Sequence, residues 1–224
     1  VQLGAGAGSF IGKIFKLDEH NRDKLIASGA GAAIGATFNA PIAGTLFVLE
    51  ELIHRFTPSM LFPTLVATVV SASVARHFLG ANTSFNTALP HITMEGSILP
   101  VCIVLGILAG VFGVLFSKTI FFFNNFYSRI KIPNYIKPAL AGFLTGLAGL
   151  FLPYILSSGN GSVEMLFKGE LPIVLVCTIF CAKFIITPLC FGSGAAGGIF
   201  LPMLMLGSFL GYITGFGANL LGAE

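Results

Sequence analysis

The segment from Gly192 to Pro202 has the residue types and spacing to bind an ion. It reads GSGAAGGIFLP and joins two apolar runs. Its four glycines fall within seven residues, and each costs about 1 kcal/mol relative to Ala inside a helix. We therefore expect the helix to break here. Irregular backbone at membrane depth is tolerated only where it is buried in protein or lines a watery cavity.

A helix that restarts near Gly198 would direct free N–H groups toward the break, with the positive end of its dipole, about half a charge. Such an end binds anions without a cationic side chain, and transporters use it near the bilayer midplane. A site made of N–H groups also suits an anion that must be released. The spacing is equally consistent with a structural role, in which the glycines only permit neighbouring helices to pack closely. A phosphate-binding P-loop does not fit, because its lysine and hydroxyl are missing.

Glu50 and Glu51 form the second candidate site, directly after a run, 25–49, that lacks charged residues. An ionisable residue at the end of a membrane helix reaches the interface or marks an ion or proton path. Adjacent helical residues point about 100° apart, so the two carboxyls are expected to differ in role. The residues alone favour a plain polar cap, with Arg55 paired to Glu51 at (i, i+4).

Other reactive side chains form no recognisable site. The four cysteines are expected to be small buried apolar residues, since no His or carboxylate ligand lies near them. Lys183, within an apolar helix, is expected to extend toward the lipid headgroups. The sequence contains no Ser-His-Asp, Cys-His or paired-carboxylate pattern, so we predict no enzyme, no metal and no cofactor. The cysteines are Cys102, Cys177, Cys181 and Cys190.

Composition indicates that lipid surrounds most of the chain. Hydrophobic residues make up 55% of it and charged residues 9%, against roughly a quarter charged in soluble domains. A membrane-spanning helix needs about 20 mostly apolar residues, and several uncharged runs are that long. These patterns predict an all-α, multi-pass membrane protein with no nucleic-acid partner. The runs without Asp, Glu, Lys or Arg are 25–49, 56–75, 96–117, 138–163 and 184–223.

The expected elements follow from these runs. The first helix carries Gly4, Gly8 and Gly12 at GxxxG spacing, which is typical of closely packed membrane helices. The basic segment from Lys118 to Lys137 predicts a cytoplasmic loop. No positively charged segment with a cleavage site opens the sequence, so we expect no signal peptide. The expected order is a helix at 1–16, a polar connection at 17–24, an apolar segment to 37, a break at 38–41, a short helix to 49, helices at 58–75, 97–123, 138–154 and 171–190 (interrupted by Pro188), and a last helix after 202.

Two motifs in this order resemble the CLC family of chloride channels and transporters. The segment from Gly192 to Pro202 resembles the family motif GSGxPGGIFxP. The segment from Ser28 to Gly44, with FNAPIAG at its end, resembles a glycine- and alanine-rich family segment ending FNAPLAG. Glu50 and Glu51 follow at the family spacing, and the first residues, VQLG, resemble those just after the GREGP motif.

The resemblance implies a fold and roles for particular residues. It implies tilted and broken helices of the CLC inverted-repeat fold, with residues 1–224 as one transmembrane domain piece, the first repeat about 1–76 and the second about 97–224. Backbone groups at Gly198, Ile199 and Phe200 would bind the central anion. Glu51 matches the proton-transfer glutamate of the exchangers, and Glu50 precedes it. The implied protein is a homodimeric chloride/proton exchanger in a bacterial plasma membrane, with the segment from Ile42 to Ala75 contributing to the dimer face.

The sequence also departs from the family pattern. Ala196 stands where the family usually has proline, which should loosen the turn and leave the amides in place. The family's serine-bearing anion loop, gating glutamate and pore tyrosine have no counterpart here, so we expect these residues alone not to transport. A passive channel of the same fold and a non-transporting membrane scaffold stay open as alternatives. So does a preference for nitrate or fluoride.

Overall fold

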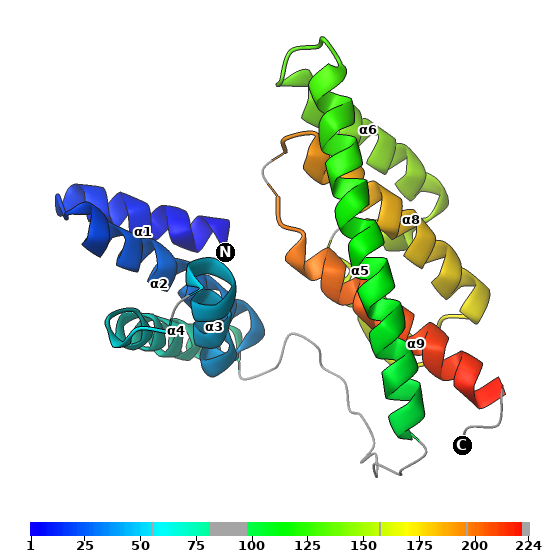
Figure 1. The fold of residues 1–224 in the computed structure, drawn as a ribbon, viewed down its shortest axis with the longest axis horizontal. Helices are drawn as coiled ribbons and strands as arrows, with labels where there is room; N and C mark the ends of the chain where they lie inside the picture. The colour runs from blue at the N-terminus through cyan, green and yellow to red at the C-terminus, as the bar shows by residue number, and fades with distance from the viewer. Residues whose placement is uncertain (55, 81–97, 157, 196, 221–224) are drawn as a thin grey trace. The chain divides into compact units, whose positions relative to one another are not determined.

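A computed structural model of the chain describes residues 1–54, 56–80, 98–156, 158–195 and 197–220. The chain divides into two compact units, Val1–Asn86 and Thr87–Glu224, and each is described by itself. All regular secondary structure in the described ranges is helical (Figure 1). This confirms the predicted all-α class.

Within residues 1–54 and 56–80, the first unit contains four α-helices and one π-helical turn. Helices α1 and α2 pack with almost no space between their backbones. A Cβ atom built on Gly4 would lie 2.1 Å from the carbonyl oxygen of Gly29, and one built on Gly8 would lie 2.2 Å from that of Leu25. The predicted GxxxG packing is therefore confirmed. The elements are α1 (Gln2–Ile14), α2 (Glu19–Phe38), α3 (Pro41–Phe47), η1 (Val48–Ile53) and α4 (Pro58–Leu79).

Helix α2 begins earlier than the sequence suggests. The polar segment expected to be a connection forms its first turns, starting at Glu19. Asp18 precedes the helix and accepts a hydrogen bond from Asn21 Nδ2 at 2.6 Å. Acidic residues at a helix N-terminus interact favourably with the dipole, which explains why a polar stretch starts a helix here.

The predicted break between α2 and α3 is confirmed. Asn39 ends α2 in the left-handed conformation with φ +54°, a conformation that Asn tolerates better than most residues. Pro41 opens α3, where its missing N–H is not needed by the helix. Arg76 of α4 donates from Nε to the side-chain oxygen of Asn39. The turn is thus tied to the end of α4.

Small residues and hydroxyls join α2, α3 and α4. A Cβ on Gly44 of α3 would lie 2.9 Å from the nitrogen of Gly35 of α2. Thr45 and Thr68 share a buried hydrogen bond of 2.8 Å, and Ser71 donates to the carbonyl of Ala32 at 2.9 Å. These contacts fix the short helix α3, which leads directly into the η1 turn.

The second unit is built around three long helices, α5, α8 and α9, which contact one another (Figure 1). Phenylalanine rings fill part of the space between α5 and α8. The ring centroids of Phe112 and Phe180 are 5.3 Å apart, and those of Phe116 and Phe184 are 5.4 Å apart. The elements are α5 (Ile98–Arg129), α6 (Ile136–Phe151), η2 (Pro153–Ile155), α7 (Asn160–Phe167), α8 (Ile173–Gly192) and α9 (Phe200–Leu220).

The structure differs from the prediction at three main places in this unit: the end of α5, the middle of α8 and the presence of α7. Helix α5 continues to Arg129, so Lys118 lies on the helix and the basic loop is shorter than expected. Helix α8 is not interrupted by Pro188, which lies buried inside it. Proline is tolerated in membrane helices because neighbouring groups satisfy the freed carbonyl. The short helix α7 has no counterpart among the predictions, although the turn before it does, at Gly159 with φ +90°.

Four helices in the described ranges are long and apolar enough to cross a membrane, and α6 is a shorter apolar helix. Many of their large apolar side chains are exposed, such as Phe62 on α4 and Ile107 on α5. Apolar surface of this kind suits lipid or further protein rather than water. The expected multi-pass membrane protein is confirmed. The four helices are Pro58–Leu79, Ile98–Arg129, Ile173–Gly192 and Phe200–Leu220.

Candidate functional site

The segment between α8 and α9 reverses the chain through a tight turn. Ser193, directly after α8, donates from Oγ to the carbonyl of Cys190 at 2.6 Å. The N–H of Ala195 donates back to Ser193 Oγ at 3.3 Å. Gly194 between them has φ +83°, a conformation that costs residues with a Cβ roughly 1–2 kcal/mol. The serine and the glycine therefore end α8 and turn the backbone.

Helix α9 begins at Phe200. The N–H of Met203 donates to the carbonyl of Ile199 at 3.0 Å, so Ile199 caps the new helix. Gly198 and Ile199 are not helical. The predicted break is confirmed. Helix α9 starts two residues after Gly198, and it includes Leu201 and Pro202, which the predicted order places before the last helix. The N–H groups of a first turn point out of the N-terminus, where the dipole is positive. Gly198, Ile199 and Phe200 thus lie where an anion would be favoured.

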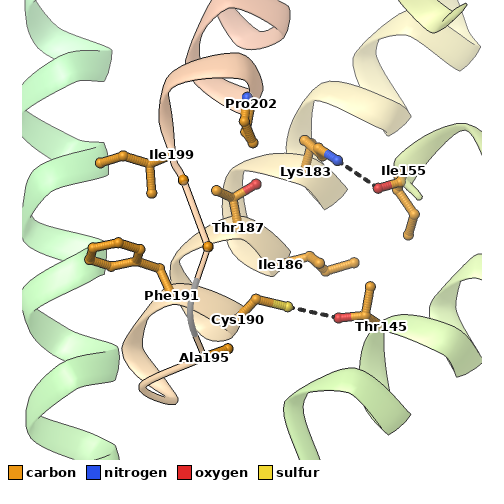
Figure 2. A pocket seen from close by; sticks show the side chains of 12 residues that line it. Thr145, Ile155, Lys183, Ile186, Thr187, Cys190, Phe191, Ala195, Ile199 and Pro202 are labelled. Atoms are coloured by element: carbon orange, nitrogen blue, oxygen red, sulfur yellow. Dashed lines mark hydrogen bonds between the residues drawn. The ribbon is translucent and has the colours of Figure 1, made fainter. Parts of the chain in front are cut away.

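The backbone of this segment borders a pocket of about 170 Å³ (Figure 2). A Cβ atom built on Gly198 would meet no heavy atom within 4 Å. Close helix packing, the alternative reading of these glycines, therefore does not account for Gly198. The lining residues are Thr145, Ile155, Lys183, Ile186, Thr187, Cys190, Phe191, Ala195, Gly197, Gly198, Ile199 and Pro202.

Lys183 of α8 lines the same pocket, and the expectation that it extends toward headgroups is wrong. Its side chain is only 4% exposed. Its Nζ donates to the carbonyl oxygen of Ile155 in η2 at 2.7 Å (Figure 2). A buried lysine is stable only with hydrogen-bond acceptors around its ammonium group, and the short η2 turn supplies one.

The cysteines are free thiols. Cys190 is half-buried, and its Sγ lies 3.0 Å from Thr145 Oγ1 at the pocket wall (Figure 2). Cys177 is also half-buried, and Cys102 and Cys181 are exposed, so the expectation that the four cysteines are buried is wrong. Both exposed cysteines lie on helices that are long and apolar enough to cross a membrane. No group of three or more His, Cys, Asp or Glu in the described ranges could hold a metal ion.

Glu50 and Glu51 lie on the η1 turn. Both side chains are exposed, whereas Val48 and Leu49 just before them are fully buried. The buried pair anchors the turn and leaves the two carboxylates at the surface of the unit. Arg55, the partner expected for Glu51 in a plain polar cap, lies outside the described residues. The proton-transfer role stays a prediction.

Fold and site together define a class of protein. Several membrane-spanning helices, one of them restarting at a glycine-rich break beside a pocket, are typical of membrane channels and secondary transporters. The whole chain, residues 1–224, matches the family described as voltage gated chloride channel, and it belongs to that family. This membership agrees with the prediction that the chain is not an enzyme.

Individual relatives are similar along almost the entire chain. The H(+)/Cl(-) exchange transporter ClcA of Vibrio campbellii is 33% identical over 99% of this chain and 48% of its own length. ClcA of Yersinia pestis is 36% identical over 98% of this chain and 47% of its own. The chain thus spans about half the length of the curated relatives that it matches.

Two solved structures share the fold. A slow cyanobacterial Cl-/H+ antiporter has a TM-score of 0.84 and 29% identity, over 98% of this chain and 52% of that one. A CLC-type fluoride/proton antiporter has a TM-score of 0.80 and 25% identity, over 98% of this chain and 54% of that one. The predicted relationship to CLC antiporters is confirmed.

Proposed function

We propose that the chain is the central part of a subunit that exchanges chloride for protons across a membrane. The observation that carries the proposal is the restart of a helix at Phe200 beside the pocket bordered by Gly198 and Ile199. The relatives named as H(+)/Cl(-) exchange transporters support the choice of ions.

The proposed anion site uses backbone N–H groups at Ile199 and Phe200. Several N–H groups and the helix dipole each contribute to the binding of a monovalent anion, so no single contact binds it tightly. Transport requires binding that is strong enough for entry and weak enough for release. Gly198 assists because the absence of a side chain leaves the approach to the first turn open.

The proposed proton path uses Glu51. Its carboxylate lies on an exposed turn two residues after the fully buried Leu49, so it can accept a proton from water at the end of an apolar segment and pass it inward. The π-helical turn that carries it supports this role, since such turns are often found at functional sites. Glu50 would stand beside the same path and contribute less, because its side chain points in another direction.

The experiment compares Glu51→Gln and Glu50→Gln in the full-length protein in liposomes, with chloride efflux and proton uptake recorded together. We expect Glu51→Gln to abolish chloride-driven proton uptake and to leave chloride efflux within about tenfold of wild type. Glu50→Gln is the matched control, since it removes the same charge one residue away, and it should stay coupled.

Full coupling in Glu51→Gln would refute the role of Glu51. Chloride efflux without any proton movement in the wild type would favour the passive channel instead. Wild-type protein that moves neither ion would favour the non-transporting scaffold.

A second candidate substrate is fluoride. The fluoride/proton antiporter with a TM-score of 0.80 supports it, and a site of N–H groups can bind either halide. Adding fluoride or nitrate to the same efflux assay distinguishes the anions, and we expect chloride to be preferred.

The assembly belongs to the same proposal. The subunit would pair as a homodimer, with residues between Ile42 and Ala75 in the contact, and the two inverted repeats would be about 1–76 and 97–224. Exposed apolar residues on α4, such as Val66 and Val70, would supply part of that contact.

A further inference from the structure

Lys183 is costly to place where it is. Its side chain is 4% exposed on an otherwise apolar helix, and a buried ammonium group loses the hydration that stabilises its charge. Charged residues inside membrane segments are expensive and usually serve a function. A methionine would fill the same space without that cost.

Lys183 lies in the wall of the pocket, with its ammonium group turned toward η2 (Figure 2). Nζ is held by the carbonyl oxygen of Ile155 at 2.7 Å, and Lys183 and Ile199 line the pocket from different elements (Figure 2). Among the described residues that line the pocket, Lys183 is the one with a formal charge. The segment that begins α9 and a lysine of α8 therefore face one small cavity.

We infer that Lys183 is an affinity-determining residue for the anion, acting through its charge from the wall of the pocket rather than by direct contact. The inference rests on the proposed function. The carbonyl of Ile155 accepts the hydrogen bond of the ammonium group and holds it at the wall of the pocket. The charge of Lys183 therefore acts on the anion at a distance, without a direct contact. Its full positive charge adds to the half charge of the α9 N-terminus, and the pocket favours small monovalent anions over cations.

The test measures equilibrium binding of chloride to the purified full-length protein by titration calorimetry. Lys183→Gln keeps a donor for Ile155 and removes the charge, so it should raise the Kd at least about tenfold, as expected for a unit charge that acts on the anion from within about 10 Å at an effective dielectric constant of about 20. Lys183→Arg keeps charge and donor and should stay within about threefold of wild type. Lys118→Gln, which removes the same charge from an exposed position on α5 outside the lining of the pocket, is the matched control and should leave the Kd unchanged.

If Lys183 had only a structural role, Lys183→Gln would lower the yield of folded protein. The protein that does fold would then bind chloride with the Kd of wild type. Unchanged affinity in Lys183→Gln, or an equal loss in Lys183→Arg, would overturn the inference and leave the proposed function standing. Wild-type protein without saturable chloride binding would overturn the proposed function itself. If Lys183→Gln does not fold, Lys183→Met takes its place, and the Arg variant alone still refutes the inference by losing affinity.

Discussion

The packing of α1 against α2 gives a sharp test of the fold, because one helix carries two glycines in opposite situations. A Cβ on Gly4 would lie 2.1 Å from the carbonyl oxygen of Gly29, whereas a Cβ on Gly6 would meet nothing within 4 Å. Gly4→Ala and Gly6→Ala therefore add the same methyl group to the same helix, once into a backbone contact and once into open space.

The magnitude follows from these distances. Ordinary van der Waals contact begins at 3.4 Å, so Gly4→Ala requires the helices to separate locally by 1.3 Å, the difference between 3.4 and 2.1 Å. Overpacking of this kind costs roughly 1–3 kcal/mol. Both variants gain the same helix propensity, about 1 kcal/mol. The difference between them isolates the steric term, so Gly4→Ala should be less stable than Gly6→Ala by roughly 1–3 kcal/mol.

The assay is denaturant-induced unfolding of the full-length protein in detergent, with the wild type and both variants measured side by side. Gly6→Ala should unfold at the same denaturant concentration as wild type or a higher one, and Gly4→Ala at a lower one. Equal free energies of unfolding for the two variants would refute the close backbone approach of α1 and α2.

The glycines of the break make a second pair of predictions, measured by the same unfolding experiment. Gly194→Ala should destabilise the protein by roughly 1–2 kcal/mol, since Gly194 has φ +83°; stability equal to wild type would contradict that backbone conformation. Gly198→Ala should change the free energy of unfolding by less than about 0.5 kcal/mol, because its Cβ would meet nothing within 4 Å; a large loss would mean that the segment is packed rather than open.

The features that the sequence predicts well are those with strong local causes. The break before α9 follows from glycines that cannot hold a helix, and the break before α3 follows from Asn39 and Pro41. The contact of α1 with α2 follows from glycines on one face. In each case the residue types decide the local backbone whatever surrounds them.

Other features depend on contacts between distant residues. Lys183 can be buried because the carbonyl of Ile155 accepts its hydrogen bond. This acceptor is a backbone group, so the types and spacing of side chains do not predict it. Pro188 lies buried inside α8, where neighbouring groups can satisfy the carbonyl that proline leaves without a partner. The π-helical turn that carries Glu50 and Glu51 has no sequence signature, so the sequence alone does not predict where the two carboxylates lie.

The most direct test of the anion site is a crystal structure of the full-length protein grown in bromide, with the anomalous signal of the ion recorded. The structure predicts a bromide peak in hydrogen-bonding contact with the backbone N–H groups of Ile199 and Phe200, at the start of α9. A well-ordered map without bromide at these amides, or with both amides bonded inside an unbroken helix, would contradict the proposed mechanism of anion binding.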